Sequence, residues 1–329
     1  MRAPAPALRC AVSMVDQSCA GSPFHPGERA IQQRLGLRDK MEAVGRRVLR
    51  DFMPDQHREF FAALPFLVLG TVDDAGWPSV SIVAGAPGFA STPDATTLRI
   101  RARPPAGDAA AANLRPGRDV GIVGIDFATR RRNRANGVVK SVDESGFDIR
   151  VMQSFGNCPK YIQARDWRAA THDEQGALQI EEGQALGAAE RAMIAAADTF
   201  FIASALGRSD ESGHGVDASH RGGLPGFVRG DDEHTLTVPD FSGNFYFNTL
   251  GNLLLNPRCG LLFLDFAAGA TLQVAAEAEI VWDGPEVAAA AGAQRLVRFH
   301  VTHWRRAENA VPLRWRFRGY SPFLAPSRT

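Results

Sequence analysis

Short apolar runs that end in turn residues recur along most of the chain. The clearest runs span 66–72, 80–84, 200–206 and 272–281. Segments 138–142 and 147–152 flank an Asp-Glu-Ser-Gly sequence at 143–146, which is the pattern of a β-hairpin. Strands this short and this closely spaced predict a mainly β protein built from barrels rather than from a parallel sheet.

Fewer segments show the three- and four-residue spacing of a helix. In 28–52, the apolar residues Met41, Val44, Val48 and Phe52 fall on one face, although two glycines weaken the pattern. Shorter helices are predicted at 55–64, 188–197 and 248–255, and an Ala-rich helix at 286–299.

Three short motifs recur in the same order at a nearly constant distance. The Pro-Gly-Phe at 87–89 returns at 225–227, and 97–100 resembles 235–238, both 138 residues later. The apolar run 120–127 resembles 259–266, which lies 139 residues later. Three ordered matches predict a tandem duplication of one β-rich unit.

The repeat divides the chain into segments. We expect a disordered tail at 1–21, an N-terminal helical extension at 22–55, a first barrel at 56–170, a linker at 171–187, a second barrel at 188–284 and a C-terminal helical segment at 285–329.

Composition and charge exclude several classes of protein. The 329 residues carry 37 Lys and Arg against 36 Asp and Glu, a net charge of +1 that disfavours nucleic acid as a partner. No stretch approaches the ~20 apolar residues that span a bilayer, and residues 1–20 lack a signal peptide's apolar core. The four cysteines form no CxxC pair, which argues against a disulfide scaffold and favours a cytoplasmic location.

Standard catalytic motifs are absent from the sequence, and we expect no metal site. There is no GxSxG, P-loop, HExxH or GxGxxG motif, and His300 and His303 have no third ligand beside them. The candidate chemistry lies instead in the second copy, where Ser219, His220 and Arg221 precede two glycines. A hydroxyl, an imidazole and a forked guanidinium suit a phosphate, and glycine lets the backbone approach a ligand.

Three amides, Asn244, Asn248 and Asn252, follow at a spacing of four residues. They have two interpretations: they line the anion-binding start of a helix, or they serve only as turns and helix caps. The first copy has Ser-Ile-Val at 81–83 where the second has Ser-His-Arg at 219–221. This asymmetry predicts that the second copy supplies the main polar contacts of a single ligand site.

The second copy resembles the pyridoxamine 5′-phosphate oxidase-like family of FMN-binding split barrels. The resemblance is carried by segments 199–204, 217–227, 235–240, 243–258, 260–266 and 278–281. The first copy, through 154–163, is similar to an uncharacterised bacterial branch of that family. Together these segments extend the resemblance over roughly 22–320, and the expected fold is two tandem split barrels that form a pseudo-dimer within one chain.

The resemblance implies a flavin mononucleotide (FMN) at the interface of the two barrels. Its phosphate would sit against a strand that carries Ser219, His220 and Arg221, and near the start of the following helix. The residues implied at that helix start are Asn244, Asn248, Thr249 and Asn252. Where the oxidase itself has an Arg-Lys pair at this position, the present chain has Asn248-Thr249.

These features predict a flavin-dependent oxidoreductase that acts on a small molecule, with a reduced nicotinamide or a partner reductase as electron donor. The flavin would carry the redox chemistry, and His220 is the candidate for proton handling because its ordinary pKa lies near neutrality. Two alternatives stay open: a non-catalytic flavin or haem carrier, and a scaffold that binds no cofactor. Whether two chains form a homodimer also stays open.

Other residues allow two interpretations each. The basic run 129–134 is either a solvated hairpin tip or a loop that reaches an anion. Cys158 is either a buried structural residue or a redox thiol, although no resolving partner is visible in the sequence. Tyr161 and Trp167 either stack on a ligand ring or belong to the core.

Overall fold

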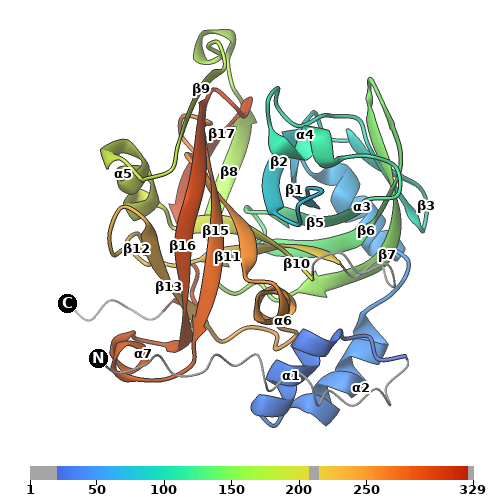
Figure 1. The fold of residues 1–329 in the computed structure, drawn as a ribbon. Coiled ribbons are helices and arrows are strands. Elements are labelled where there is room, and N and C mark those ends of the chain that lie inside the picture. The colour runs from blue at the N-terminus through green and yellow to red at the C-terminus, as the bar shows by residue number, and fades with distance from the viewer. Residues whose placement is uncertain (1–20, 207–214, 325–329) are drawn as a thin grey trace.

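Two antiparallel sheets with the same strand order form most of the computed structural model, which describes residues 21–206 and 215–324 (Figure 1). The first sheet has the order β2-β1-β5-β6-β7-β4-β3. Its strands are β1 (Phe66–Val72), β2 (Pro78–Ala84), β3 (Ala90–Asp94), β4 (Thr97–Ile100), β5 (Asp119–Asp126), β6 (Arg131–Asp143) and β7 (Gly146–Asn157).

The second sheet has the order β11-β10-β14-β15-β16-β13-β12, and β9 (Gln179–Gly183) also pairs with β16. Its other strands are β10 (Thr199–Ala205), β11 (Val216–Gly222), β12 (Arg229–Gly230), β13 (Thr235–Phe241), β14 (Arg258–Leu264), β15 (Thr271–Val281) and β16 (Ala293–Glu308). A separate pair joins β8 (Ala164–Ala169) to β17 (Leu313–Gly319). The prediction of a mainly β chain with two tandem barrels is confirmed.

The two barrels pack through equivalent surfaces. On β5, a side chain at Gly121 would lie 2.7 Å from the carbonyl oxygen of Val216 on β11. On β14, a side chain at Gly260 would lie 2.8 Å from the carbonyl oxygen of Pro78 on β2. Each barrel therefore presses a backbone against the other at a position where only glycine fits. A duplication would produce this symmetry, and duplication as its origin stays a prediction.

Apolar residues form one core inside each barrel and a third core between the barrels. Phe61 and Leu67 lie in the first barrel's core, and Phe200 and Phe263 lie in the second. The core between the barrels contains Phe66, Val68, Val80, Ile82, Val123, Ile125, Phe127, Ile162, Phe201, Ala203, Ala218, Leu262, Leu264, Val311, Leu313 and Trp315. This third core makes the pseudo-dimer a single packed unit.

The helices cover the ends of the barrels (Figure 1). They are α1 (Pro26–Arg34), α2 (Arg38–Val48), α3 (Asp55–Ala63), α4 (Ala109–Asn113), α5 (Ala188–Ala196), α6 (Asn248–Leu255) and α7 (Pro285–Ala289). The predicted helices at 55–64, 188–197 and 248–255 agree with α3, α5 and α6 to within one residue. The predicted helix at 28–52 is divided after α1, where Gly36 has a φ of +67°. None of the described helices is long and apolar enough to cross a membrane.

The predicted helix at 286–299 and the helical segment at 285–329 are wrong. Of the residues described between 285 and 324, only the five of α7 form an α-helix, and the 16-residue strand β16 follows. In β16, Val297, Phe299 and Val301 alternate along the strand and are buried, so their packing overrides the helix propensity of the preceding alanines. The second barrel therefore continues past 284, and the predicted linker at 171–187 contains the whole of β9. The predicted tail at 1–21 lies outside the described residues apart from Gly21.

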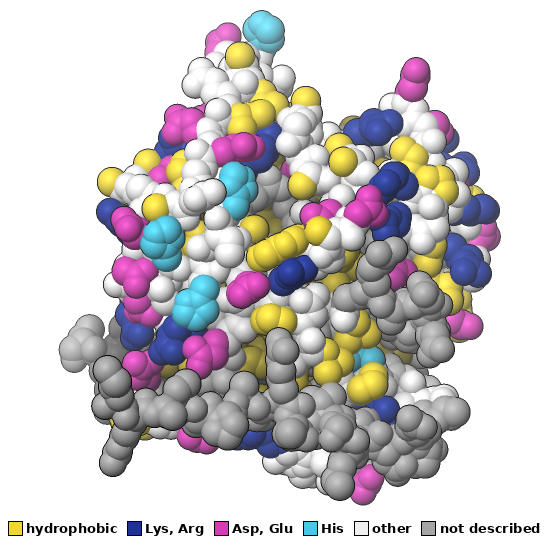
Figure 2. All heavy atoms as spheres, in the orientation of Figure 1, with side chains coloured by type: hydrophobic (Ala, Val, Ile, Leu, Met, Phe, Trp, Pro, Cys, Tyr) yellow, Lys and Arg dark blue, Asp and Glu magenta, His cyan; other side chains and the backbone are white. Residues whose placement is uncertain are grey.

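Charged side chains of both signs are interspersed over the face shown in Figure 2. This distribution agrees with the net charge of +1 and leaves no single-sign patch over that face.

Candidate functional site

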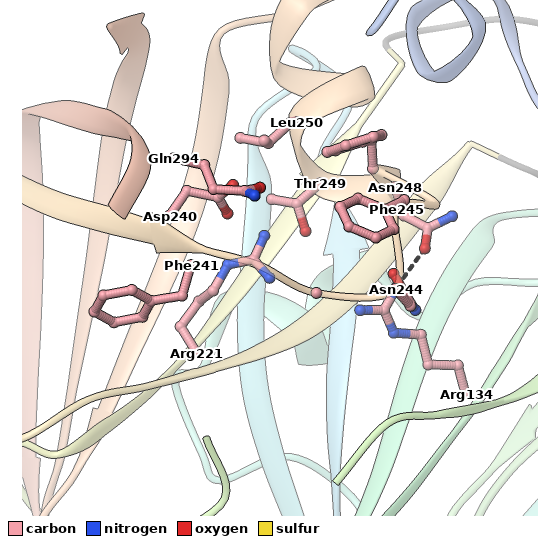
Figure 3. A pocket seen from close by; sticks show the side chains of 12 residues that line it. Arg134, Arg221, Asp240, Phe241, Asn244, Phe245, Asn248, Thr249, Leu250 and Gln294 are labelled. Carbon is pink, nitrogen blue, oxygen red and sulfur yellow. Dashed lines mark hydrogen bonds between the residues drawn. The ribbon is translucent and has the colours of Figure 1, made fainter. Parts of the chain in front are cut away.

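Two adjoining pockets lie where the start of α6 approaches the first barrel, and Figure 3 shows the one under α6. The pocket under α6, here called the helix pocket, is lined by Arg134, Arg221, Asp240, Phe241, Gly243, Asn244, Phe245, Phe247, Asn248, Thr249, Leu250 and Gln294. The second, here called the inter-barrel pocket, shares six of these residues and adds Arg132, Asn157, Cys158, Lys160, Tyr161, His220, Gly222, Phe227 and Pro239. Their empty volumes, which include the open space at each mouth, are about 420 and 560 Å³.

A tight segment between β13 and α6 forms one wall of both pockets. Phe245 and Phe247 in this segment have φ values of +62° and +65°, which bulky side chains rarely adopt. Tyr161 of the first barrel donates its hydroxyl hydrogen to the carbonyl oxygen of Ser242 at 3.0 Å, and its ring lies 5.3 Å from that of Phe241. The strained backbone turns α6 so that its first residue faces the first barrel.

Arg134 connects the barrels at the back of the helix pocket. It lies on β6, and its Nη1 donates to Oδ1 of Asp217 and to Oδ1 of Asn248, both at 2.8 Å. Its Nη2 donates to Oγ of Ser219 at 2.5 Å. All of these partners belong to the second barrel, so Arg134 is held in place by contacts across the interface. Burial lowers the pKa of Arg134, and the neighbouring Asp217 opposes that shift.

Glu28 reaches this cluster from α1. Its Oε1 accepts from Nδ2 of Asn248 at 2.5 Å, and its Oε2 accepts from the backbone nitrogen of His25 at 2.9 Å. Burial raises the pKa of Glu28 to about 8, because the cost of desolvating the carboxylate exceeds the help from these hydrogen bonds. Glu28 is therefore mostly neutral at pH 7 and does not compensate the positive charge of the pocket.

Arg132 and His220 meet in the inter-barrel pocket. Nη1 of Arg132 lies 3.0 Å from Nδ1 of His220, and its Nη2 donates to the carbonyl oxygen of Cys158 at 3.0 Å. Burial and the nearby guanidinium of Arg132 hold the pKa of His220 well below its ordinary value, so the ring is neutral at pH 7. If His220 transfers a proton, as the sequence predicts, the ring must start in its neutral form.

Arg221 extends from β11 toward the space below α6 (Figure 3). It has no ion pair within 4 Å to any other described residue. The nearby Asp240 lies 3.7 Å from Nε of Arg295 instead, and burial raises the pKa of Asp240. Four basic side chains and one carboxylate line the inter-barrel pocket, so this part of the described chain has a surplus of positive charge.

The equivalent place in the first barrel is filled by the chain itself. Asp108 is the N-cap of α4, and its Oδ1 accepts from the backbone nitrogen of Ala110 at 2.8 Å. Its Oδ2 accepts from Ser81 at 2.7 Å and from Gln273 at 2.8 Å. By strand register, Ser81 is the counterpart of Ser219, and Gln273 is the counterpart of Arg134. A carboxylate of the protein thus occupies the anion position of this half.

At the corresponding position, α6 begins with Phe247 as N-cap, and no side chain caps the helix. The backbone N–H groups of the first turn of a helix need an acceptor, and they favour an anion. In the second half, the counterparts Ser219 and Arg134 donate instead to Asp217 on β11, and this carboxylate does not cap the helix. The second half therefore differs from the first in leaving the start of its helix without a capping side chain.

The structure brings together five of the seven predicted site residues. His220, Arg221, Asn244, Asn248 and Thr249 line one or both pockets.

The other two predicted residues lie behind the pocket walls. Ser219 is fully buried between Arg134 and Thr249, which it contacts by hydrogen bonds. Asn252 donates to Oγ of Ser204 at 3.1 Å, and Asn113 of the first barrel makes the matching bond to Thr71, also at 3.1 Å. Because both barrels contain this bond, we assign Asn252 a role in holding α6 against its strand.

Several site residues were not predicted from the sequence. In the basic run 129–134, Arg132 and Arg134 are buried in β6, so the interpretation as a solvated hairpin tip is wrong for these two. Their spacing of two residues on a strand is the signal that could have placed them on one face. Glu28 and Asp217 carry no comparable signal, because their roles depend on contacts between distant segments.

Cys158 and Tyr161 line the inter-barrel pocket, whereas Trp167 lies outside both pockets on β8 and is 39% exposed. Among the described residues, no group of three or more His, Cys, Asp and Glu is placed to hold a metal ion.

Comparison with known families agrees with this architecture. Residues 53–181 match the model of the pyridoxamine 5′-phosphate oxidase family. The first barrel is therefore similar to the pyridoxamine 5′-phosphate oxidase family over these residues. The family match includes Arg132 and Arg134, while α6 and Arg221 lie in the second barrel, outside the matched residues. No curated protein is significantly similar to the chain in sequence.

Three of the solved structures to which the chain is similar cover about two fifths of it. The H111A variant of HupZ from Group A Streptococcus is 12% identical, with a TM-score of 0.29, and the match covers 37% of this chain and 98% of that chain. An FAD-binding protein from Mesorhizobium loti is 11% identical, with a TM-score of 0.25 and coverage of 39% and 97%. DIP1874 from Corynebacterium diphtheriae, a conserved protein of unknown function, is 14% identical, with a TM-score of 0.28 and coverage of 40% and 98%.

Proposed function

We propose that each chain binds one FMN, with the flavin phosphate in the helix pocket, and works as a flavin-dependent oxidoreductase. The observation that carries this proposal is the contrast between the two halves. Asp108 fills the anion position of the first barrel, whereas the start of α6 has no capping side chain and Arg221 has no ion pair with a described residue. One uncapped helix start beside one unpaired arginine supports one phosphorylated ligand per chain.

The residues present fit such a group. Arg221 supplies a forked donor, Thr249 supplies a hydroxyl, and the first turn of α6 supplies backbone N–H groups. Nε of Arg134 is buried and has no hydrogen-bond partner among the described residues. Because buried donors are normally satisfied, this nitrogen is suited to an acceptor from a ligand.

Bound flavin would supply the hydride and electron transfer, which no side chain of the chain needs to perform. Arg221 and Thr249 would hold the phosphate, and Arg134 would keep the two barrels in register behind it. His220, neutral and fixed by Arg132, would serve as a hydrogen-bond donor through Nε2. The electron donor would be a reduced nicotinamide or a partner reductase, and the expected location is the cytoplasm. A second chain is not needed to build the site, because both barrels that form it belong to one chain.

The direct test is a spectrum of the purified protein followed by titration with FMN. We expect a yellow protein, or uptake of one FMN per chain by the colourless protein. The Arg221→Ala substitution should weaken FMN binding by roughly 1.5–3 kcal/mol, because a charge-assisted contact is lost. Val83→Ala, the matched change in the first barrel, should leave the affinity nearly unchanged.

Other outcomes would contradict the proposal. Equal effects of Arg221→Ala and Val83→Ala on the FMN affinity would contradict the assignment of a single site. A protein that takes up no FMN would contradict flavin binding. Consumption of NADH or NADPH by the FMN-loaded protein, with or without an added reductase, separates an oxidoreductase from a flavin carrier. A haem spectrum in place of a flavin spectrum would favour a haem carrier.

A further inference from the structure

The inter-barrel pocket has a corner that the proposed phosphate contacts do not use. Arg132 of β6 and His220 of β11 come from opposite barrels and meet there, with Nη1 and Nδ1 separated by 3.0 Å. Arg132 is 9% exposed and His220 is 3% exposed. The carbonyl oxygen of Cys158 fixes the other guanidinium nitrogen at 3.0 Å. This corner is therefore preorganised by the fold rather than by mobile surface side chains.

The hydrogen bonding of this corner leaves donors unused. An arginine has only N–H donors, so Nδ1 of His220 must accept, and the proton of the neutral ring then lies on Nε2. Nε2 of His220 and Nε of Arg132 are both buried and have no hydrogen-bond partner in the described chain. A buried N–H group without an acceptor is costly, so an acceptor from a ligand would relieve this cost.

The charges around the pocket point to the same kind of ligand. Arg132, Arg134, Lys160 and Arg221 line it, and Asp240 is the single carboxylate among the lining residues. Arg134 is already paired with Asp217. A phosphate beside Arg221 in the helix pocket would leave Arg132 and Lys160 without an anion, because neither has an ion pair with a described residue.

We propose that the corner formed by Arg132 and His220 binds a second oxyanion, the carboxylate or phosphate of the molecule that exchanges electrons with the flavin. This inference rests on the proposed function, and it makes the substrate or electron donor an anionic molecule. A planar guanidinium and a neighbouring N–H donor suit either oxyanion. Because Arg132 comes from the first barrel and the phosphate contacts come from the second, each barrel supplies one of the two anion sites.

The test uses FMN-saturated protein, so that the helix pocket is occupied, and titrates it calorimetrically with inorganic phosphate and, separately, with acetate. We expect one of these anions to bind, and the tighter one identifies the phosphate or the carboxylate as the source. Arg132→Gln should weaken that binding about 10- to 100-fold, since a charge-assisted contact is lost. Arg132→Lys should lose less, because it keeps the charge without the fork.

The matched control is Arg131→Gln. Arg131 precedes Arg132 on the same strand, is exposed, and places its guanidinium 5.0 Å from the ring centroid of Phe60, outside both pockets. The Arg131→Gln substitution should leave anion binding unchanged. The FMN affinity of all these variants should stay within about threefold of the wild-type value. If Arg132→Gln does not fold, the anion affinity of Arg132→Lys is compared with that of Arg131→Lys instead.

The inference is overturned if FMN-saturated wild-type protein binds neither anion, or if the Arg132 and Arg131 variants bind equally well. Failure of the proposed function looks different. In that case the protein takes up no FMN, while the ligand-free protein still binds phosphate or acetate in a way that depends on Arg132.

Discussion

Glu28 should make the stability of this protein fall as the pH rises from 5 to 8. The perturbation that tests this is Glu28→Gln, which keeps the shape of the side chain and an oxygen that accepts from Asn248. In the unfolded chain, a glutamate ionises with a pKa of about 4.5, whereas burial raises the pKa of Glu28 to about 8. Between these two values the folded state holds a proton that the unfolded state has released.

The sign and the size of the effect follow from that difference. Stability falls with rising pH wherever the folded state binds more protons than the unfolded state. Each pKa unit corresponds to about 1.4 kcal/mol, so the interval from pH 5 to pH 8 removes on the order of 3 kcal/mol. The charged or titratable groups that face Glu28 are Asp217, Arg134 and His25, and its carboxylate lies 3.5 Å from Nε2 of His25.

Urea-induced unfolding at several pH values measures this contribution. Wild-type protein and Glu28→Gln should have similar stability at pH 5, and the variant should be the more stable of the two at pH 8. Glu42→Gln is the matched control, because Arg38 and Arg46 pair with Glu42 and its pKa is lowered, so its contribution does not change between pH 5 and 8. Parallel stability curves for wild type and Glu28→Gln over this range would refute the reasoning.

Two further substitutions test the pseudo-dimer and its filled half. Gly121→Ala should destabilise the fold by about 1–3 kcal/mol in thermal unfolding, because its Cβ would lie 2.7 Å from the backbone of the other barrel; Gly230→Ala, where the nearest atom is 4.0 Å away, should have little effect. Asp108→Ala should cost roughly 1–3 kcal/mol of stability, since it uncaps α4 and leaves Ser81 without its partner, and an FMN titration should show unchanged affinity and stoichiometry. A stable Asp108→Ala variant with altered FMN binding would contradict the assignment of the ligand to the other half.

The strands were predictable where burial followed the apolar pattern of the sequence. Predicted run 66–72 coincides with β1, and 272–281 begins one residue after the start of β15. The failure at 286–299 has a physical cause. Alanines favour a helix locally, but Val297 and Phe299 are buried between β13 and β15, and this packing decides the structure of the segment.

The site was only partly predictable because the barrels assemble it from distant segments. The asymmetry with the first copy marked Arg221, and the regular spacing of three amides marked Asn248. Glu28, by contrast, contacts Asn248 across 220 residues of chain. Arg134 sits in a basic run that resembles a solvated turn, and only the packing of β6 against β11 shows that it is buried. Such roles depend on the docking of two folded units, which no local pattern encodes.

The difference between Asp108 and Phe247 explains why two barrels in one chain are more than a dimer with a linker. In a dimer of identical chains, any residue that fills one interface site also fills the other, because one sequence builds both. Here the two N-cap positions can differ, and one carries a carboxylate that satisfies its own cradle while the other leaves α6 uncapped. The closed half then contributes stability through Asp108, and its β6 contributes Arg132 and Arg134 to the open half. The proposed single ligand follows from this difference between the barrels. The first barrel closes its own helix start with Asp108, and the same barrel supplies Arg132 and Arg134 to the site at α6.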